Sequence, residues 1–134
     1  MFTVIYNKED GQVLSISGGI ANEEELKNAI PETSGYIFVE SLPQINHYRQ
    51  YMAVQNNSLV VINMTLSAEQ EKFVIRMETS EEMAELKAKL SASDYKTLKF
   101  VDGALDETEY APIRAERAAL RAKINELESK LAQL

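Results

Sequence analysis

The sequence predicts an α+β protein, with a small antiparallel β-rich domain at the N-terminus, then helices, and a coiled-coil helix at the C-terminus. Two observations predict this. The first 66 residues alternate short apolar runs with turn residues, which is typical of hairpins. Beyond them the apolar period becomes helical, and the last 22 residues form a heptad seam. We therefore expect a β-rich head (1–66), a helix plus an extended connector (67–111) and a coiled-coil helix (112–134).

Five strands are expected in the head, each an apolar run bounded by turn residues. They cover residues 2–6, 12–17, 36–40, 48–54 and 59–64. The first two flank Asp10-Gly11 and the last two flank residues 55–58, so each pair predicts a hairpin. The strand at 59–64 is apolar on both faces, which favours a central position in the sheet.

Capping boxes predict two helices. Asn22 precedes Glu25 by three residues and opens a short helix that Pro31 stops. Ser67 and Gln70 open a second helical segment, whose apolar residues continue at helical spacing in one long helix or in two.

The segment between these helices and the C-terminal seam is less regular. Residues 91–103 predict a short strand or an extended stretch, ended by a turn at Asp102-Gly103. Pro112 is acceptable only near the start of a helix, so we expect the terminal helix to begin there.

The terminal helix carries a narrow apolar stripe with alternating spacings of three and four, broken only by Arg117. A single helix cannot bury such a narrow stripe alone, which predicts a coiled coil with other copies of the chain or with another protein. The predicted seam consists of Ile113, Arg117, Leu120, Ile124, Leu127, Leu131 and Leu134.

The charges beside this seam predict a parallel arrangement. In a parallel pairing Glu116 faces Arg121 of the next chain, and Lys123 faces Glu128. Residues 123–128 have the basic, apolar and acidic pattern of short trimeric coils, so we expect a trimer rather than a dimer. The alternative is that the helix folds back and buries its stripe on the protein's own sheet.

The composition argues against several partners and processes. The chain has 134 residues, 45% of them hydrophobic, a net charge of -7 and no cysteine. The acid surplus argues against nucleic acid, because phosphate-binding surfaces need clustered Lys and Arg. No apolar run approaches the ~20 residues of a membrane span, and residues 1–6 lack the basic leader of a secretion signal. We expect neither nucleic acid nor membrane as a partner.

No pattern predicts catalysis, a cofactor or a metal. The single histidine, His47, has no serine-based motif around it. The acidic groups at 23–25 and 81–85 lie near helix starts, where carboxylates suit the helix dipole, and calcium-loop spacing is missing. Tyr48, Arg49 and Tyr51 form a candidate partner-contact patch on one strand, with burial of these tyrosines as the alternative.

The C-terminal third resembles small tail-fibre-associated proteins of tailed bacteriophages and prophages. The similarity lies in SDYKTLKFVDGAL (93–105), EYAPIRAER (109–117) and LRAKINELE (120–128). It extends loosely over the front half, through Leu42-Pro43 and a tyrosine-rich strand. The resemblance implies a packing and oligomerisation pattern, in a part of the tail tip or fibre or in a chaperone that helps fibres to trimerise.

We therefore expect a non-enzymatic tail structural protein, associated with a tail fibre or baseplate protein and with its own copies. Its location would be the virion, and the host cytoplasm during assembly. A tail-fibre assembly chaperone is the first alternative. The others are an enzyme acting on glycan or cell wall, for which Glu40 is the only acid in the strand region outside turns and helix starts, and a regulatory binding protein with a dimerising tail.

Overall fold

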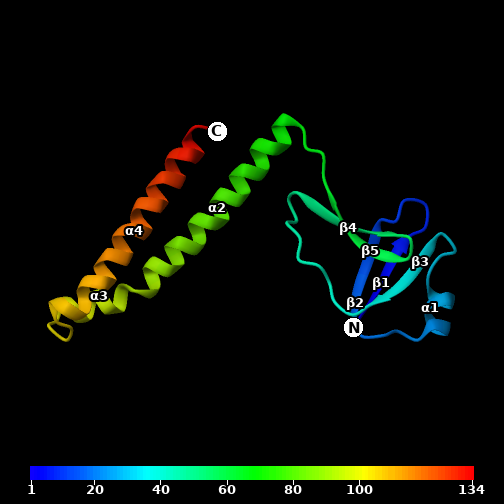
Figure 1. The fold of residues 1–134 in the computed structure, drawn as a ribbon, viewed down its shortest axis with the longest axis horizontal. Coiled ribbons are helices and arrows are strands. Elements are labelled where there is room, and N and C mark those ends of the chain that lie inside the picture. Colours follow the sequence, from blue (N-terminus) through cyan, green and yellow to red (C-terminus); the bar gives the residue numbers. More distant parts are fainter. The chain divides into compact units, whose positions relative to one another are not determined.

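A computed structural model describes all 134 residues, and the chain divides into two compact units (Figure 1). We refer to Met1–Leu66 as the β unit and to Ser67–Leu134 as the helical unit. The fold class is α+β, as the sequence predicts, because small antiparallel sheets precede three helices. The elements in chain order are β1 (Phe2–Asn7), β2 (Val13–Gly18), α1 (Glu23–Ala29), β3 (Ser34–Val39), β4 (Gln50–Gln55), β5 (Ser58–Asn63), α2 (Ala68–Ala92), α3 (Asp94–Val101) and α4 (Glu107–Ala132).

The β unit is built on a three-stranded antiparallel sheet in which β1 lies between β2 and β3. Val4 in the middle of β1 pairs with Ile16 on one side and Ile37 on the other. Val4, Ile37 and Val54 form the buried core, and half-buried apolar side chains surround them. The surrounding side chains are Tyr6, Val13, Ile16, Val39 and Leu59.

The second hairpin forms as predicted, but its return strand is not central. β4 and β5 make a separate two-stranded sheet, so β5 lies at an edge and the central strand of the unit is β1. An apolar strand need not be central, because β5 is half-buried against the core through Leu59. Its turn consists of Asn56 and Asn57, both with positive φ (49° and 59°), which two-residue hairpin turns require and Asn tolerates.

The two sheets meet at the start of β2. Gln12 forms an isolated bridge with Ala53, and the Val54 N–H donates to the Gly11 carbonyl at 2.8 Å. A Cβ on Gly11 would lie 2.3 Å from the Val54 oxygen, and its φ is +76°, so this approach of two backbones requires glycine. The contact places β4 beside the first hairpin.

The segment that follows β2 is tied to β1 and leads into α1. The Thr3 hydroxyl donates to the Gly19 carbonyl at 2.8 Å and accepts from the Ala21 N–H at 3.1 Å. Asn22 caps α1 by accepting from the N–H groups of its first turn, as predicted, and Leu26 is the buried residue of that helix. These polar ties allow Thr3 to be buried with 1% of its surface exposed.

The helical unit is a hairpin of two long helices, α2 and α4, joined at a corner by the short helix α3 (Figure 1). α2 is one continuous helix of 25 residues, and its predicted capping box between Ser67 and Gln70 is formed. None of the helices is both long enough and apolar enough to cross a membrane.

Three predictions for this unit are wrong. The expected extended connector is helical, because residues 94–101 form α3. α4 begins at Glu107 rather than at Pro112, since Asp106 and Glu109 form a capping box that the sequence reading missed. Residues 67–134 are also one compact unit rather than a connector and a separate coil. Pro112 is accommodated inside α4, where it leaves the carbonyl of the exposed Thr108 without its helical donor.

Candidate functional site

The apolar stripe of α4, predicted as an interchain seam, lies against α2 of the same chain. Ile124 and Leu127 are 7% and 3% exposed, and the stripe's other apolar residues (Ile113, Leu120, Leu131 and Leu134) are half-buried. On α2 the corresponding apolar residues are Val74, which is buried, and Met77, Met83, Leu86 and Leu90, which are half-buried. The structure differs from the alternative in which the stripe is buried on the protein's own sheet, since α2 covers the stripe within the chain.

Two of the four charged residues predicted to join neighbouring chains, Lys123 and Glu128, have ionic partners within this chain. The Lys87 ammonium lies 3.5 Å from the Glu128 carboxylate, and Lys123 lies 3.3 Å from Glu126. Glu116 and Arg121 are exposed on α4. The association of copies stays a prediction, and it would compete with the intrachain contact for the residues of the stripe.

Arg117, the polar break in the stripe, closes the corner between the helices. Arg117 is 7% exposed, and its guanidinium donates to the Leu90 carbonyl near the end of α2 at 2.8 Å. It also donates to the Ser93 hydroxyl and to the Asp94 carboxylate, the latter at 2.8 Å. A buried cation is tolerated here because its donors meet a helix-end carbonyl, a hydroxyl and a carboxylate.

A second set of contacts joins α3 to α4 around Tyr110, which is 5% exposed. Its ring stacks on Phe100 with centroids 4.3 Å apart, and its hydroxyl lies 2.9 Å from the Thr97 hydroxyl. The Arg114 guanidinium lies over both rings, at 5.3 Å from the Phe100 centroid and 5.1 Å from that of Tyr110.

Arg114 also forms a forked hydrogen bond to Glu107 in the first turn of α4. This hydrogen bond lowers the pKa of the Glu107 carboxyl and raises the pKa of Arg114. Arg114 thereby links the start of α4 to the aromatic pair.

The side of α3 that does not contact α4 is apolar and exposed to solvent. Tyr95, Leu98 and Val101 are 67%, 60% and 74% exposed, and successive members are three residues apart, so they project from one side of the helix. Thr97 and Phe100, which face α4, point the other way. We call Tyr95, Leu98 and Val101 the α3 face.

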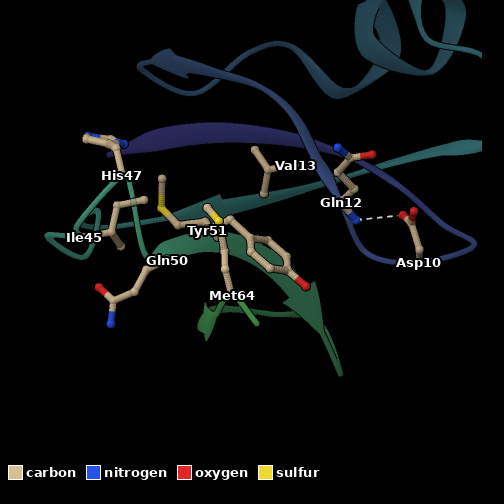
Figure 2. A pocket seen from close by; sticks show the side chains of 9 residues that line it. Asp10, Gln12, Val13, Ile45, His47, Gln50, Tyr51 and Met64 are labelled. Atoms are coloured by element: carbon tan, nitrogen blue, oxygen red, sulfur yellow. Dashed lines mark hydrogen bonds between the residues drawn. The ribbon is translucent and has the colours of Figure 1, made fainter. Parts of the chain in front are cut away.

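The β unit contains a pocket of about 660 Å³, which Figure 2 shows from close by. Of the predicted contact patch, only Tyr51 lies in it, with 42% of its surface exposed. Tyr48 and Arg49 are half-buried, lie in the turn before β4 and do not line the pocket. Contact of a partner with Tyr48, Arg49 and Tyr51 stays a prediction. The pocket is lined by Asp10, Gln12, Val13, Ile45, His47, Gln50, Tyr51, Met52 and Met64.

Most of this lining was not predicted, because it assembles from distant parts of the sequence. The backbone contact between Gly11 and Val54 brings the first hairpin beside β4, and the segment before β4 adds Ile45 and His47. No local pattern links these residues. The only sequence signal was the unexplained histidine beside a tyrosine-rich strand.

The pocket wall is held by hydrogen bonds. The Asp10 carboxylate accepts from the Gln12 N–H at 2.9 Å (Figure 2). The Gln50 amide accepts from the Asn46 N–H at 3.1 Å and donates to the Asn63 amide oxygen at 2.9 Å. Gln50 is therefore engaged in structure, whereas Asp10 retains a second carboxylate oxygen.

The acidic residues weighed for chemistry are scattered. No group of three or more His, Asp or Glu side chains gathers where a metal ion would bind. Glu40 follows the end of β3 and is exposed, beside the apolar residues of a shallow groove. No paired carboxylates of the kind that glycoside hydrolysis uses converge in the pocket, which has Asp10 as its single acid.

Comparison with protein-family models, curated proteins and solved structures gives no match for this chain. We therefore infer its function from the geometry of the two units and from the resemblance in residues 93–128.

Proposed function

We propose that this protein is a non-enzymatic structural component of a bacteriophage tail, associated with the tail fibre or baseplate and docked to another tail component. The observation that carries the proposal is the position of the three stretches with the family resemblance. Residues 93–105, 109–117 and 120–128 cover α3, the following turn and most of α4.

These stretches supply the contacts that close the corner of the helical unit. Arg117 bonds to Ser93 and Asp94, and Tyr110 stacks on Phe100, with all five residues inside the resembling stretches. The resemblance is thus explained by side chains that pack a helical corner, not by side chains that converge on a substrate. A packed helical corner suits a structural part of a larger assembly.

The α3 face supports a docking role for that corner. Three large apolar side chains project from a helix of eight residues, and contiguous exposed apolar surface in soluble proteins commonly marks a protein interface. Lys99 lies 5.2 Å from the Tyr95 ring and places a positive charge at the edge of the face. The occupant that we propose is the apolar surface of another tail protein.

Self-association is the second part of the proposal. A trimer through Ile124 and Leu127 requires α4 to leave α2, because both side chains are buried in the single chain. Light scattering of the purified chain measures this directly. A mass of three chains supports the predicted coil, whereas a mass of one chain assigns the stripe to the intrachain hairpin and leaves docking to the α3 face.

Particle composition tests the tail assignment. We expect mass spectrometry of purified particles from a phage that encodes this chain to find it at several copies per particle. Detection only in lysates would favour the fibre-assembly chaperone instead.

A variant pair then tests the docking surface. The double variant that combines Tyr95→Asp with Leu98→Asp is expected to keep the helical unit folded but to be absent from particles. Leu14→Asp is the matched control, because Leu14 is 55% exposed on β2 of the other unit. Equal incorporation of all three proteins would contradict docking through the α3 face.

A further inference from the structure

The pocket of the β unit has one apolar wall and one acidic end. Val13, Ile45, Met52 and Met64 supply aliphatic and thioether surface. Figure 2 shows the Tyr51 ring among the apolar side chains, with Asp10 and Gln12 at one end of the pocket. A ligand that matches this lining needs an apolar stem and a polar head.

The charge of the lining specifies the head. Asp10 is the only carboxylate in the pocket, and neither lysine nor arginine lines it. The whole β unit carries seven acidic and three basic side chains, so its field also favours a cation. The remaining titratable side chain, His47, lies at the end of the pocket away from Asp10 (Figure 2), so an anionic head at the Asp10 end would meet the carboxylate with no basic side chain beside it.

From this geometry we infer that the pocket binds the side chain of an arginine or a lysine from a protein partner. The methylene stem would lie along Val13, Met52 and Met64, as the stems of these residues do on apolar surfaces. The charged head would reach the Asp10 carboxylate and the face of Tyr51, which together provide an ionic hydrogen bond and a cation–π contact.

The pocket is suited to this ligand in two further respects. Asp10 is held in place because one oxygen accepts from the Gln12 N–H at 2.9 Å, and this leaves the other oxygen for the ligand. Methionines adapt to the stem because the unbranched thioether side chain has several rotatable bonds. The Gln50 amide, already bonded to Asn46 and Asn63, fixes the wall beside Tyr51.

This binding role deepens the proposed docking role. It rests on the proposed function only where it takes the partner to be a tail protein. Binding of a basic side chain is a property of the pocket itself. A peptide titration therefore tests the pocket, whereas particle composition tests the tail assignment, and either can fail while the other holds.

The experiment uses the full-length chain, labelled with 15N, and blocked tripeptides as probes. Acetyl-Ala-Arg-Ala-amide and its lysine counterpart are expected to shift the amide resonances of residues 10–13, 50–52 and 64. The citrulline counterpart has nearly the same shape without the charge, and it is expected to bind roughly two- to fivefold more weakly, the range for an exposed ion pair.

Two substitutions locate the charge. Asp10→Asn keeps the acceptor for the Gln12 N–H but removes the charge, and it should reduce arginine binding to the level of citrulline. Glu9→Gln is the matched control, because it removes the same charge from the neighbouring exposed residue, which does not line the pocket. Tyr51→Leu should weaken the arginine and lysine peptides and leave the fold intact, since Tyr51 is 42% exposed.

Three results would overturn the inference. The first is equal binding of the arginine and citrulline peptides, and the second is an equal effect of the Asp10 and Glu9 substitutions. The third is a pocket whose resonances respond to a neutral sugar, with N-acetylglucosamine as the probe, but to neither basic peptide.

Discussion

The contacts inside the β unit differ in kind from the contacts inside the helical unit. In the β unit, distant segments meet through backbone pairing, and the central Val4 is 0% exposed between its two neighbouring strands. In the helical unit, side chains of two long helices meet along a stripe, and a buried arginine closes the corner. The first arrangement depends on where backbones can approach, and the second depends on what the side chains bury.

This difference decides which substitutions each unit tolerates. An added methyl group is critical at Gly11, where the gap to the Val54 carbonyl leaves no room for it. At an exposed position of α4 such a change would matter little, because the helix backbone bonds to itself and only the stripe contacts α2. Four variants test the contrast, in order of decreasing effect.

The largest effect is expected from Ile124→Asp. It places a carboxylate at a position that is 7% exposed against α2, and should lower the free energy of unfolding of the helical unit by about 4 kcal/mol or more. Urea denaturation followed by far-ultraviolet circular dichroism measures this. Leu98→Asp is the control at a 60% exposed position and should change stability by less than about 0.5 kcal/mol.

The same variant distinguishes the intrachain hairpin from the predicted coil. If Ile124→Asp converts a trimer into a folded monomer with an unchanged helical signal, the stripe serves partner chains and the hairpin contact is dispensable.

Gly11→Ala should be the most damaging small change in the β unit. The new Cβ would lie 2.3 Å from the Val54 oxygen at a φ of +76°, so the strain and the displaced backbone bond should cost about 3 kcal/mol. Gly18→Ala is the control, because nothing lies within 4 Å of a Cβ there. Thermal unfolding compares the two, and similar midpoints would show that the approach of β4 to the first hairpin contributes little.

Arg117→Ala should destabilise the helical unit by about 2 kcal/mol. It removes the donors to the Leu90 carbonyl, Ser93 and Asp94, and leaves a helix end with fewer partners. Arg121→Ala removes an equal charge from an exposed position of the same helix and should have almost no effect. Equal denaturation midpoints for the two variants would mean that water replaces the Arg117 contacts without loss.

The smallest effect concerns pH and Glu107. Because the folded state lowers the pKa of this carboxyl, its contribution to stability is complete above the ordinary glutamate range and is lost as pH falls through the lowered folded value. Glu107→Gln should therefore reduce the slight loss of stability of the wild type in acid, whereas Glu116→Gln should not. Thermal unfolding at several acidic pH values measures the difference, and parallel curves for both variants would refute it.

The sequence predicted the elements better than their partners. Features that depend on neighbours within a few residues all form. They are the helix caps at Asn22 and Ser67, both hairpins and the turn at Gly103. The sheet position of β5 depends on distant residues, and here the prediction differs from the structure. The packing of α2 on the α4 stripe also depends on distant residues and was not predicted. α2 and α4 have nearly equal lengths (25 and 26 residues), which suits an antiparallel pair, but the sequence prediction began α4 at Pro112 and left this match hidden.

The candidate site was predicted least well. Tyr51 was selected for its aromatic ring, but Tyr48 and Arg49 beside it in sequence lie outside the pocket. Tyr48 and Arg49 lie in the turn before β4, not in the strand that carries Tyr51, so sequence proximity alone did not place them in the pocket. Asp10 and Met64, more than fifty residues apart, line the same pocket.

The sequence by itself determined the fold class, the positions of most helices and strands, and a helix with one narrow apolar stripe. These features follow from local conformational preference and from the period of apolar residues. The tertiary structure decided that α2 covers this stripe, that Arg117 closes the corner, and that the first hairpin and β4 share a pocket. An apolar stripe specifies only that it must be buried, because hydrophobic attraction has no direction, and the geometry of the chain selects the partner.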